Sequence, residues 1–231
     1  MMNKEKKYHE TDYMSGLVTE NYPVLLIMSR FGIGLGFGEK NIREVCEENG
    51  VDTDTFLTVV NMLFGTGITD SSVRKVSVAS LLSYLHSSHD YFLGFRLPGI
   101  REKLFSAVGG DDDLSQAIRN YFDEYVAEVD RHMSYEEKKV FPYVKKLLEG
   151  IKPDDYSIDV FGRQHDQVEA RLREFKNIII KYYPSESTNE INGVLFDIFN
   201  CQNDLAAHND VEDMLFVPAV SLLEQKITSH R

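Results

Sequence analysis

Cysteine is scarce in this chain. Its 231 residues include only two cysteines, Cys46 and Cys201, which lie far apart and form no CxxC pair. Two isolated thiols do not make a disulfide framework. We therefore expect both to be reduced thiols of an intracellular protein.

The chain also lacks long apolar runs and an excess of positive charge. No run approaches the roughly 18 apolar residues of a transmembrane helix, and the start MMNKEKKYHETDY has no apolar segment typical of a signal peptide. Lysine and arginine total 25 against 37 acidic residues, for a net charge of −12. Because nucleic acids and anionic membranes attract basic surfaces, neither is an expected partner. The expected location is the cytoplasm.

The remaining composition is typical of a globular protein with an ordinary core. Hydrophobic residues make up 42% and charged residues 27% of the chain. The length suits one large domain or a large and a small one. We expect a loose N-terminus over residues 1–13, a small helical domain over 14–66 whose short helices end at glycines, and a larger unit over 75–227.

The larger unit contains four long segments with helical periodicity. Apolar residues recur in them at spacings of three and four, and the connections between them are short and rich in Gly, Pro, Ser or Asp. Four long helices with short connections predict an antiparallel bundle. The expected fold class is therefore all-α.

Two of these segments repeat one motif. HMSYEEKKVFP starts at His132 and HNDVEDMLFVP starts at His208, and each has a glutamate four residues on, Glu136 or Glu212. Residues four apart lie on one face of a helix, so each histidine and its glutamate can point at the same place. A proline follows each histidine by ten residues, and we expect it to kink the helix or to mark where the helix leaves the bundle.

The other two long segments each carry a central histidine, His86 and His165. Four imidazoles and two carboxylates inside one bundle suit two metal ions, because carboxylates can bridge cations. A single interior histidine is more often a core residue than a ligand. Burying the whole set without a metal would cost much free energy, which favours the metal site.

Spacing alone does not decide the roles of several residues next to the predicted ligands. His89 shares a helix face with His86 and is either an extra ligand or a residue behind the ligands, and Glu137 is adjacent to Glu136. Four acids lie one turn from a predicted ligand and are either solvated or hydrogen-bonded to a ligating histidine: Asp90, Glu128, Glu169 and Asp204. The solvated alternative is favoured for Asp204.

At these residues the sequence resembles a known family. YLHSSHDYFLGFRLPGI (84–100), GRQHDQVE (162–169), DLAAHNDVEDMLFVP (204–218) and the HMSYE motif are similar to the hemerythrin-like HHE cation-binding domain. The most similar group is the RIC (repair of iron centres) family of di-iron proteins. Residues 14–65 also resemble the short N-terminal domain of that family, most clearly in ENYPVLLIMSRFGIGLGFGEKNIREVCEENGVD (20–52).

The resemblance implies a non-haem di-iron centre in which two glutamates bridge the irons, with manganese or zinc less favoured. It selects Glu136 over Glu137 and Glu212 over Asp213. The implied ligands are His86, His132, Glu136, His165, His208 and Glu212.

The sequence departs from the RIC pattern in its glycine-rich turn. Family members usually have two adjacent cysteines there, and Gly36 and Phe37 stand in their places. Gln164 stands where a glutamate often precedes the third histidine. Oxygen-carrying hemerythrins differ more, because they have a histidine where this chain has Glu169, and they end in HxxxxD rather than HxxxE.

These features predict a di-iron protein that repairs iron–sulfur clusters or handles nitric oxide under nitrosative or oxidative stress. Iron–sulfur proteins are its expected clients, O₂ and NO its expected small ligands, and a homodimer is compatible with the sequence. No residue has the setting of a nucleophile or general base, so a conventional enzyme is not expected. The alternatives are an O₂- or NO-binding sensor, in which residues 14–65 pass the change to a partner, and a metal-storage or structural bundle.

Overall fold

The computed structural model describes residues 6–110, 112–153, 156–161, 166–184 and 188–229, without the side chains of 166–169. Within these ranges every regular element is helical, apart from one isolated bridge between Tyr13 and Asn41. The predicted all-α class is confirmed. None of the described helices is both long and apolar enough to cross a membrane.

The chain divides into two compact units, and each is described by itself. The first contains Met1–Ser88, Tyr143–Asp159 and Val211–Arg231, and the second contains His89–Pro142 and Val160–Asp210. These bounds fall inside helical elements and not in a linker, and the predicted division between residues 66 and 75 stays a prediction.

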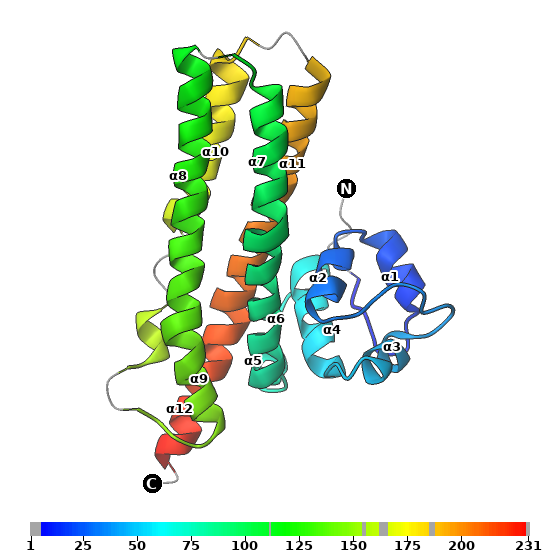
Figure 1. The fold of residues 1–231 in the computed structure, drawn as a ribbon. Coiled ribbons are helices and arrows are strands. Elements are labelled where there is room, and N and C mark those ends of the chain that lie inside the picture. Colours follow the sequence, from blue (N-terminus) through cyan, green and yellow to red (C-terminus); the bar gives the residue numbers. More distant parts are fainter. Residues whose placement is uncertain (1–5, 111, 154–155, 162–165, 185–187, 230–231) are drawn as a thin grey trace. The chain divides into compact units, whose positions relative to one another are not determined.

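The first unit starts with short helices. These are α1 (Met14–Glu20), α2 (Val24–Arg30), α3 (Ile42–Glu48), α4 (Thr53–Phe64) and α5 (Asp70–Val73), and α6 (Val78–Tyr91) follows them (Figure 1). Side chains set where α3 and α4 begin. The side chain of Asn41 accepts a hydrogen bond from the N–H of Glu44, and that of Asp52 accepts one from Thr55, so free N–H groups of the first turns are satisfied.

The chain before α1 differs from the expected loose N-terminus where it is described. Tyr8 is buried, its N–H donates to Oδ1 of Asn61 at 2.7 Å, and the Asn61 amide donates back to the Tyr8 carbonyl at 3.0 Å. The Asn61 side-chain amide thus exchanges two hydrogen bonds with the backbone N–H and C=O of Tyr8, as a residue of a neighbouring β-strand does. This exchange and the packing of Tyr8 fix residues near the N-terminus to α4.

The second unit is a four-helix arrangement. Its long helices are α7 (Leu97–Ala107), α8 (Asp113–Tyr135), α10 (Asp166–Tyr182) and α11 (Thr188–Val211), which run side by side in Figure 1. Phe175 of α10 packs on the rings of Tyr121 and Phe122 of α8. Asp197 of α11 pairs with Lys103 of α7. The predicted bundle of long helices is therefore present.

The two long helices that carry the repeated motif continue past it. α8 passes through a five-residue π-helix, η2 (Glu136–Val140), into α9 (Phe141–Leu148). α11 passes through η4 (Glu212–Phe216) into α12 (Val217–Ser229). A third π-helix, η1 (Phe92–Arg96), joins α6 to α7. A short 3₁₀ helix, η3, covers Ile158–Val160.

A buried carboxylate in α12 holds a loop of the first unit. Glu224 is 6% exposed and accepts hydrogen bonds from the Tyr143 hydroxyl at 2.5 Å and the Ile158 N–H at 2.9 Å. Since Ile158 follows a segment with little regular structure, this carboxylate supplies a partner for a backbone group that helices do not satisfy.

We predict that Glu224→Ala lowers the free energy of unfolding by about 2 kcal/mol, because the Ile158 N–H and the Tyr143 hydroxyl lose their acceptor. Urea unfolding of the metal-free protein measures this change. Glu149→Ala, at an exposed position, serves as the control. Equal stability of the two variants would contradict the assigned role of Glu224.

Candidate metal centre

Three π-helical turns shape the region around the repeated motif. In each of η1, η2 and η4 the carbonyl of the first residue accepts a hydrogen bond from the N–H five residues later. Two of these turns start at the motif glutamates, Glu136 and Glu212, and the third starts three residues after His89. Single π turns inside α-helices are rare overall. Those that do occur are frequently found at functional sites.

A proline follows every one of these π turns. Pro98, Pro142 and Pro218 each come one residue after the residue that closes the turn. A proline has no N–H to donate, and in an α-helix its ring meets the carbonyl four residues before it. A wider turn relieves this conflict without ending the helix. At Pro142 and Pro218 the sequence predicts a kink or the point where the helix leaves the bundle. The structure instead has a π turn before each proline, and the helix continues past it.

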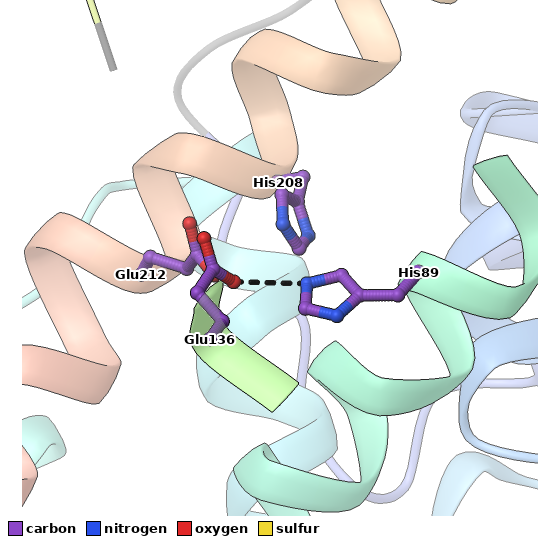
Figure 2. Close-up of side chains that lie close together, drawn as sticks. All are labelled: His89, Glu136, His208 and Glu212. Atoms are coloured by element: carbon purple, nitrogen blue, oxygen red, sulfur yellow. Dashed lines mark ion pairs between the residues drawn. The ribbon is translucent and has the colours of Figure 1, made fainter. Parts of the chain in front are cut away.

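Four buried side chains from separate parts of the sequence come together next to these turns. They are His89, Glu136, His208 and Glu212, and each offers a ligand atom within 4.8 Å of those of the others. Figure 2 shows their functional ends pointing toward one another. His89 comes from α6, Glu136 from η2 and His208 from α11, and Glu212 follows His208 by one helical turn.

Glu136 holds two imidazoles at once. Its Oε2 lies 2.9 Å from Nε2 of His89, and its Oε1 lies 2.9 Å from Nε2 of His132. Burial raises the pKa of the Glu136 carboxyl, but hydrogen bonds from His132 and His89 outweigh burial and hold this pKa well below its ordinary value. The carboxylate is therefore charged although its side chain is fully buried.

His89 is held on both edges and on one face. Its Nδ1 lies 2.8 Å from Oε1 of Glu137, while its Nε2 faces Glu136. Its ring stacks on Phe141, with centroids 5.2 Å apart and planes 9° from parallel. The ring of His208 lies edge-on to His89 at 5.3 Å and to Phe92 at 5.8 Å. Aromatic rings thus line the cluster on its apolar sides.

The structure brings four of the six predicted ligands to this region and does not bring His86. His86 is exposed, whereas His89 is 2% exposed and belongs to the cluster. His165 lies outside the described residues. The four that meet are His132, Glu136, His208 and Glu212, and their binding of a metal stays a prediction.

Helix periodicity explains the difference between His86 and His89. His89 continues the buried stripe of Leu82, Leu85 and Phe92, and the spacings between successive members of this stripe are three, four and three residues. His86 shares its face with Ser83 and Asp90, which are both exposed. The apolar pattern LLSYLHSSHDYF therefore held a signal that favours His89, which the motif resemblance did not use.

The neighbouring acids have different settings. Glu137 approaches His89, as described above, and Glu128 pairs with Arg171 at 2.8 Å. Asp204 is 8% exposed, so the solvated alternative favoured for it is wrong. Asp90 is exposed, and the side chain of Glu169 lies outside the described part of the chain.

The donor set fits a metal centre. Glu136, His208 and Glu212 each have 0% exposure, and carboxylates buried beside imidazole nitrogens would carry a large desolvation cost that a cation offsets. Mixed nitrogen and oxygen ligation suits iron, manganese or zinc. The residues that would hold such ions are His89, His132, Glu136, His208 and Glu212.

We expect Glu136→Ala and Glu212→Ala each to lower metal content and to remove the rise in melting temperature that bound metal gives, because the imidazoles lose their shared carboxylate. Elemental analysis of anaerobically purified protein and thermal melts measure both effects. Glu124→Ala, at an exposed site on α8, is the control. Full occupancy and unchanged melting in both glutamate variants would rule out this site.

Pro142→Ala tests the π turn. Alanine supplies an N–H and removes the clash, so the turn can revert to α geometry, which rotates Glu136 away from the imidazoles. We expect metal affinity to fall about tenfold with helix content unchanged, as measured by metal titration and circular dichroism. Pro184→Ala, at an exposed loop position, is the control. Equal affinity in both proline variants would contradict this role.

Comparison with known proteins places this geometry in a family. The model of the hemerythrin HHE cation-binding domain matches residues 80–220, which is more than half of the chain and includes every residue of the cluster. A comparison with curated proteins finds no match. Four helices, a buried cluster of two histidines and two glutamates, and a match of this extent agree with one another, and the chain belongs to the hemerythrin HHE cation-binding domain family.

Proposed function

We propose that this protein is a non-haem di-iron protein that acts in the repair of iron–sulfur clusters or in the handling of nitric oxide under stress. The observation that carries the proposal is the buried Glu136 carboxylate, each oxygen of which lies 2.9 Å from a different imidazole. A carboxylate with one oxygen toward each of two histidines is arranged to lie between two cations. Histidine and carboxylate ligands together suit iron.

Each part of the site has a chemical task in this proposal. A bound iron pair would supply the change of oxidation state. Glu136 and Glu212 offset the positive charge of the cations inside the bundle, and His89, His132 and His208 provide neutral nitrogen donors. The rings of Phe92 and Phe141 cover the imidazoles, which limits the access of water and favours small uncharged ligands such as NO and O₂.

A second candidate is an O₂- or NO-binding sensor, and the N-terminal region favours it. Gly36, which stands where RIC proteins have a cysteine, has φ of +96°, a conformation that side chains with a Cβ rarely adopt. Cys46 is buried, and burial raises its pKa to about 12, so its thiol is protonated at neutral pH. No reactive thiolate is therefore available from either position to take up iron.

The expected clients of the first candidate are iron–sulfur proteins. We place its work in the cytoplasm because both cysteines are free thiols that lie buried in the fold. The sensor candidate instead needs a partner that reads a change in the helices before residue 66.

Two measurements on reduced, anaerobically purified protein distinguish these functions. We expect two irons per chain, and transfer of iron to an apo iron–sulfur protein mixed with it, if repair is the function. Stopped-flow mixing with NO that gives a stable, reversible adduct without iron transfer would favour sensing. Zinc in place of iron, with no charge-transfer absorption, would contradict both and indicate storage or a structural role.

A further inference from the structure

Two adjacent carboxylates of one π turn reach the same imidazole. Glu136 approaches Nε2 of His89 at 2.9 Å, and Glu137 approaches Nδ1 of the same ring at 2.8 Å. The two residues are consecutive and both lie in η2. The HMSYEE motif therefore supplies one carboxylate, from Glu136, for the Nε2 edge of the His89 ring and another, from Glu137, for its Nδ1 edge.

The π turn accounts for this double contact. In an α-helix consecutive side chains diverge widely around the axis, whereas a π turn has more residues in each turn, so consecutive side chains diverge less. Glu136 and Glu137 can therefore lie on either side of a ring that enters from α6. Phe141, the residue that closes the same turn, stacks flat on that ring. One turn of helix thus fixes the ring at both edges and on one face.

We propose that Glu137 is a positioning residue for the metal centre: it accepts the Nδ1–H of His89 and so keeps Nε2 as the nitrogen that binds a cation. The proposal rests on metal binding by the cluster, which is part of the proposed function, but not on the identity of the metal or on repair of clusters. A histidine ligand needs one nitrogen free of protons, and an acceptor for the other N–H selects which one.

Burial and exposure distinguish the tasks of the two glutamates. The Glu136 side chain has 0% exposure and faces the cluster, whereas that of Glu137 is 32% exposed and lies behind the ring. Water can replace Glu137 as a partner at that position, so its loss should cost little stability in the metal-free protein. Its contribution should instead appear in metal affinity, where a supporting carboxylate typically contributes about 10–100-fold.

Asp213 shows that sequence position alone does not create such a residue. It follows Glu212 as Glu137 follows Glu136, but it is exposed and has a shorter side chain. The contact with His89 depends on the approach of α6 to η2, and on the reach of a glutamate.

The test compares Glu137→Ala, Glu137→Gln and the control Glu124→Gln, which removes the same charge at an exposed site on α8. Zinc affinity is measured by competition with a chelating dye, and the Nδ1–H of His89 is observed by NMR of zinc-loaded protein with ¹⁵N-labelled histidine. We expect Glu137→Ala to lower affinity at least tenfold and to lose the slowly exchanging Nδ1–H resonance. Glu137→Gln, which keeps an acceptor oxygen, should lose less affinity and retain the resonance.

His89→Ala separates failure of this proposal from failure of the metal site. Loss of zinc affinity in His89→Ala, with wild-type affinity and an unchanged resonance in Glu137→Ala, would overturn the role of Glu137 and leave the metal site in place. Wild-type affinity in both variants would overturn that role together with the assignment of His89 as a ligand. Equal melting of the metal-free wild-type protein and the two Glu137 variants, which we expect, excludes unfolding as the cause of any loss in the Glu137 variants.

Discussion

The burial of the charged Glu136 carboxylate inside a helical bundle is the constraint on which this structure depends. Glu136 is charged and has no exposed surface, so the free energy lost with its hydration must be recovered from partners in the fold. His89 and His132 provide the contacts that are seen, and cations bound by these side chains would offset the negative charge directly. The other features of the site serve this arrangement: stacked and edge-on rings exclude water, and Glu137 holds one imidazole from behind.

The π turns show how a local sequence feature serves a tertiary requirement. Two of them begin at cluster glutamates, and all three precede a proline that an α-turn would not accommodate. An insertion of one residue in the turn changes which side chains face the interior without ending the helix. The HxxxE spacing and the proline six residues after the glutamate therefore act together. The π turn between them directs the glutamate to the bundle interior, and the helix then continues in α geometry.

Two positions before residue 66 bear on which of the two proposed functions is favoured. The backbone of Gly36 is in a conformation that suits glycine, and Cys46 is a buried thiol with a raised pKa. A protein whose N-terminal region exchanges iron through thiolates needs the opposite properties at these positions. This difference from the RIC pattern makes binding of a small ligand as physically reasonable as delivery of iron, and it separates the chemistry of the metal cluster from that of the N-terminal helices.

The sequence by itself determined the helical class and the long helices of the bundle, because these follow from periodicity. Spacing within single helices put His132 with Glu136 and His208 with Glu212 on shared faces, whereas their choice as metal ligands followed from the family resemblance and stays a prediction. The tertiary structure placed His89 rather than His86 in the cluster, as the apolar pattern of that helix favours, and it alone decided that Glu137 contacts His89. It also showed that residues near the N-terminus pack through Tyr8. The reason is that spacing fixes which residues share a helix face, whereas the face that meets the interior is chosen by the packing of helices distant in sequence.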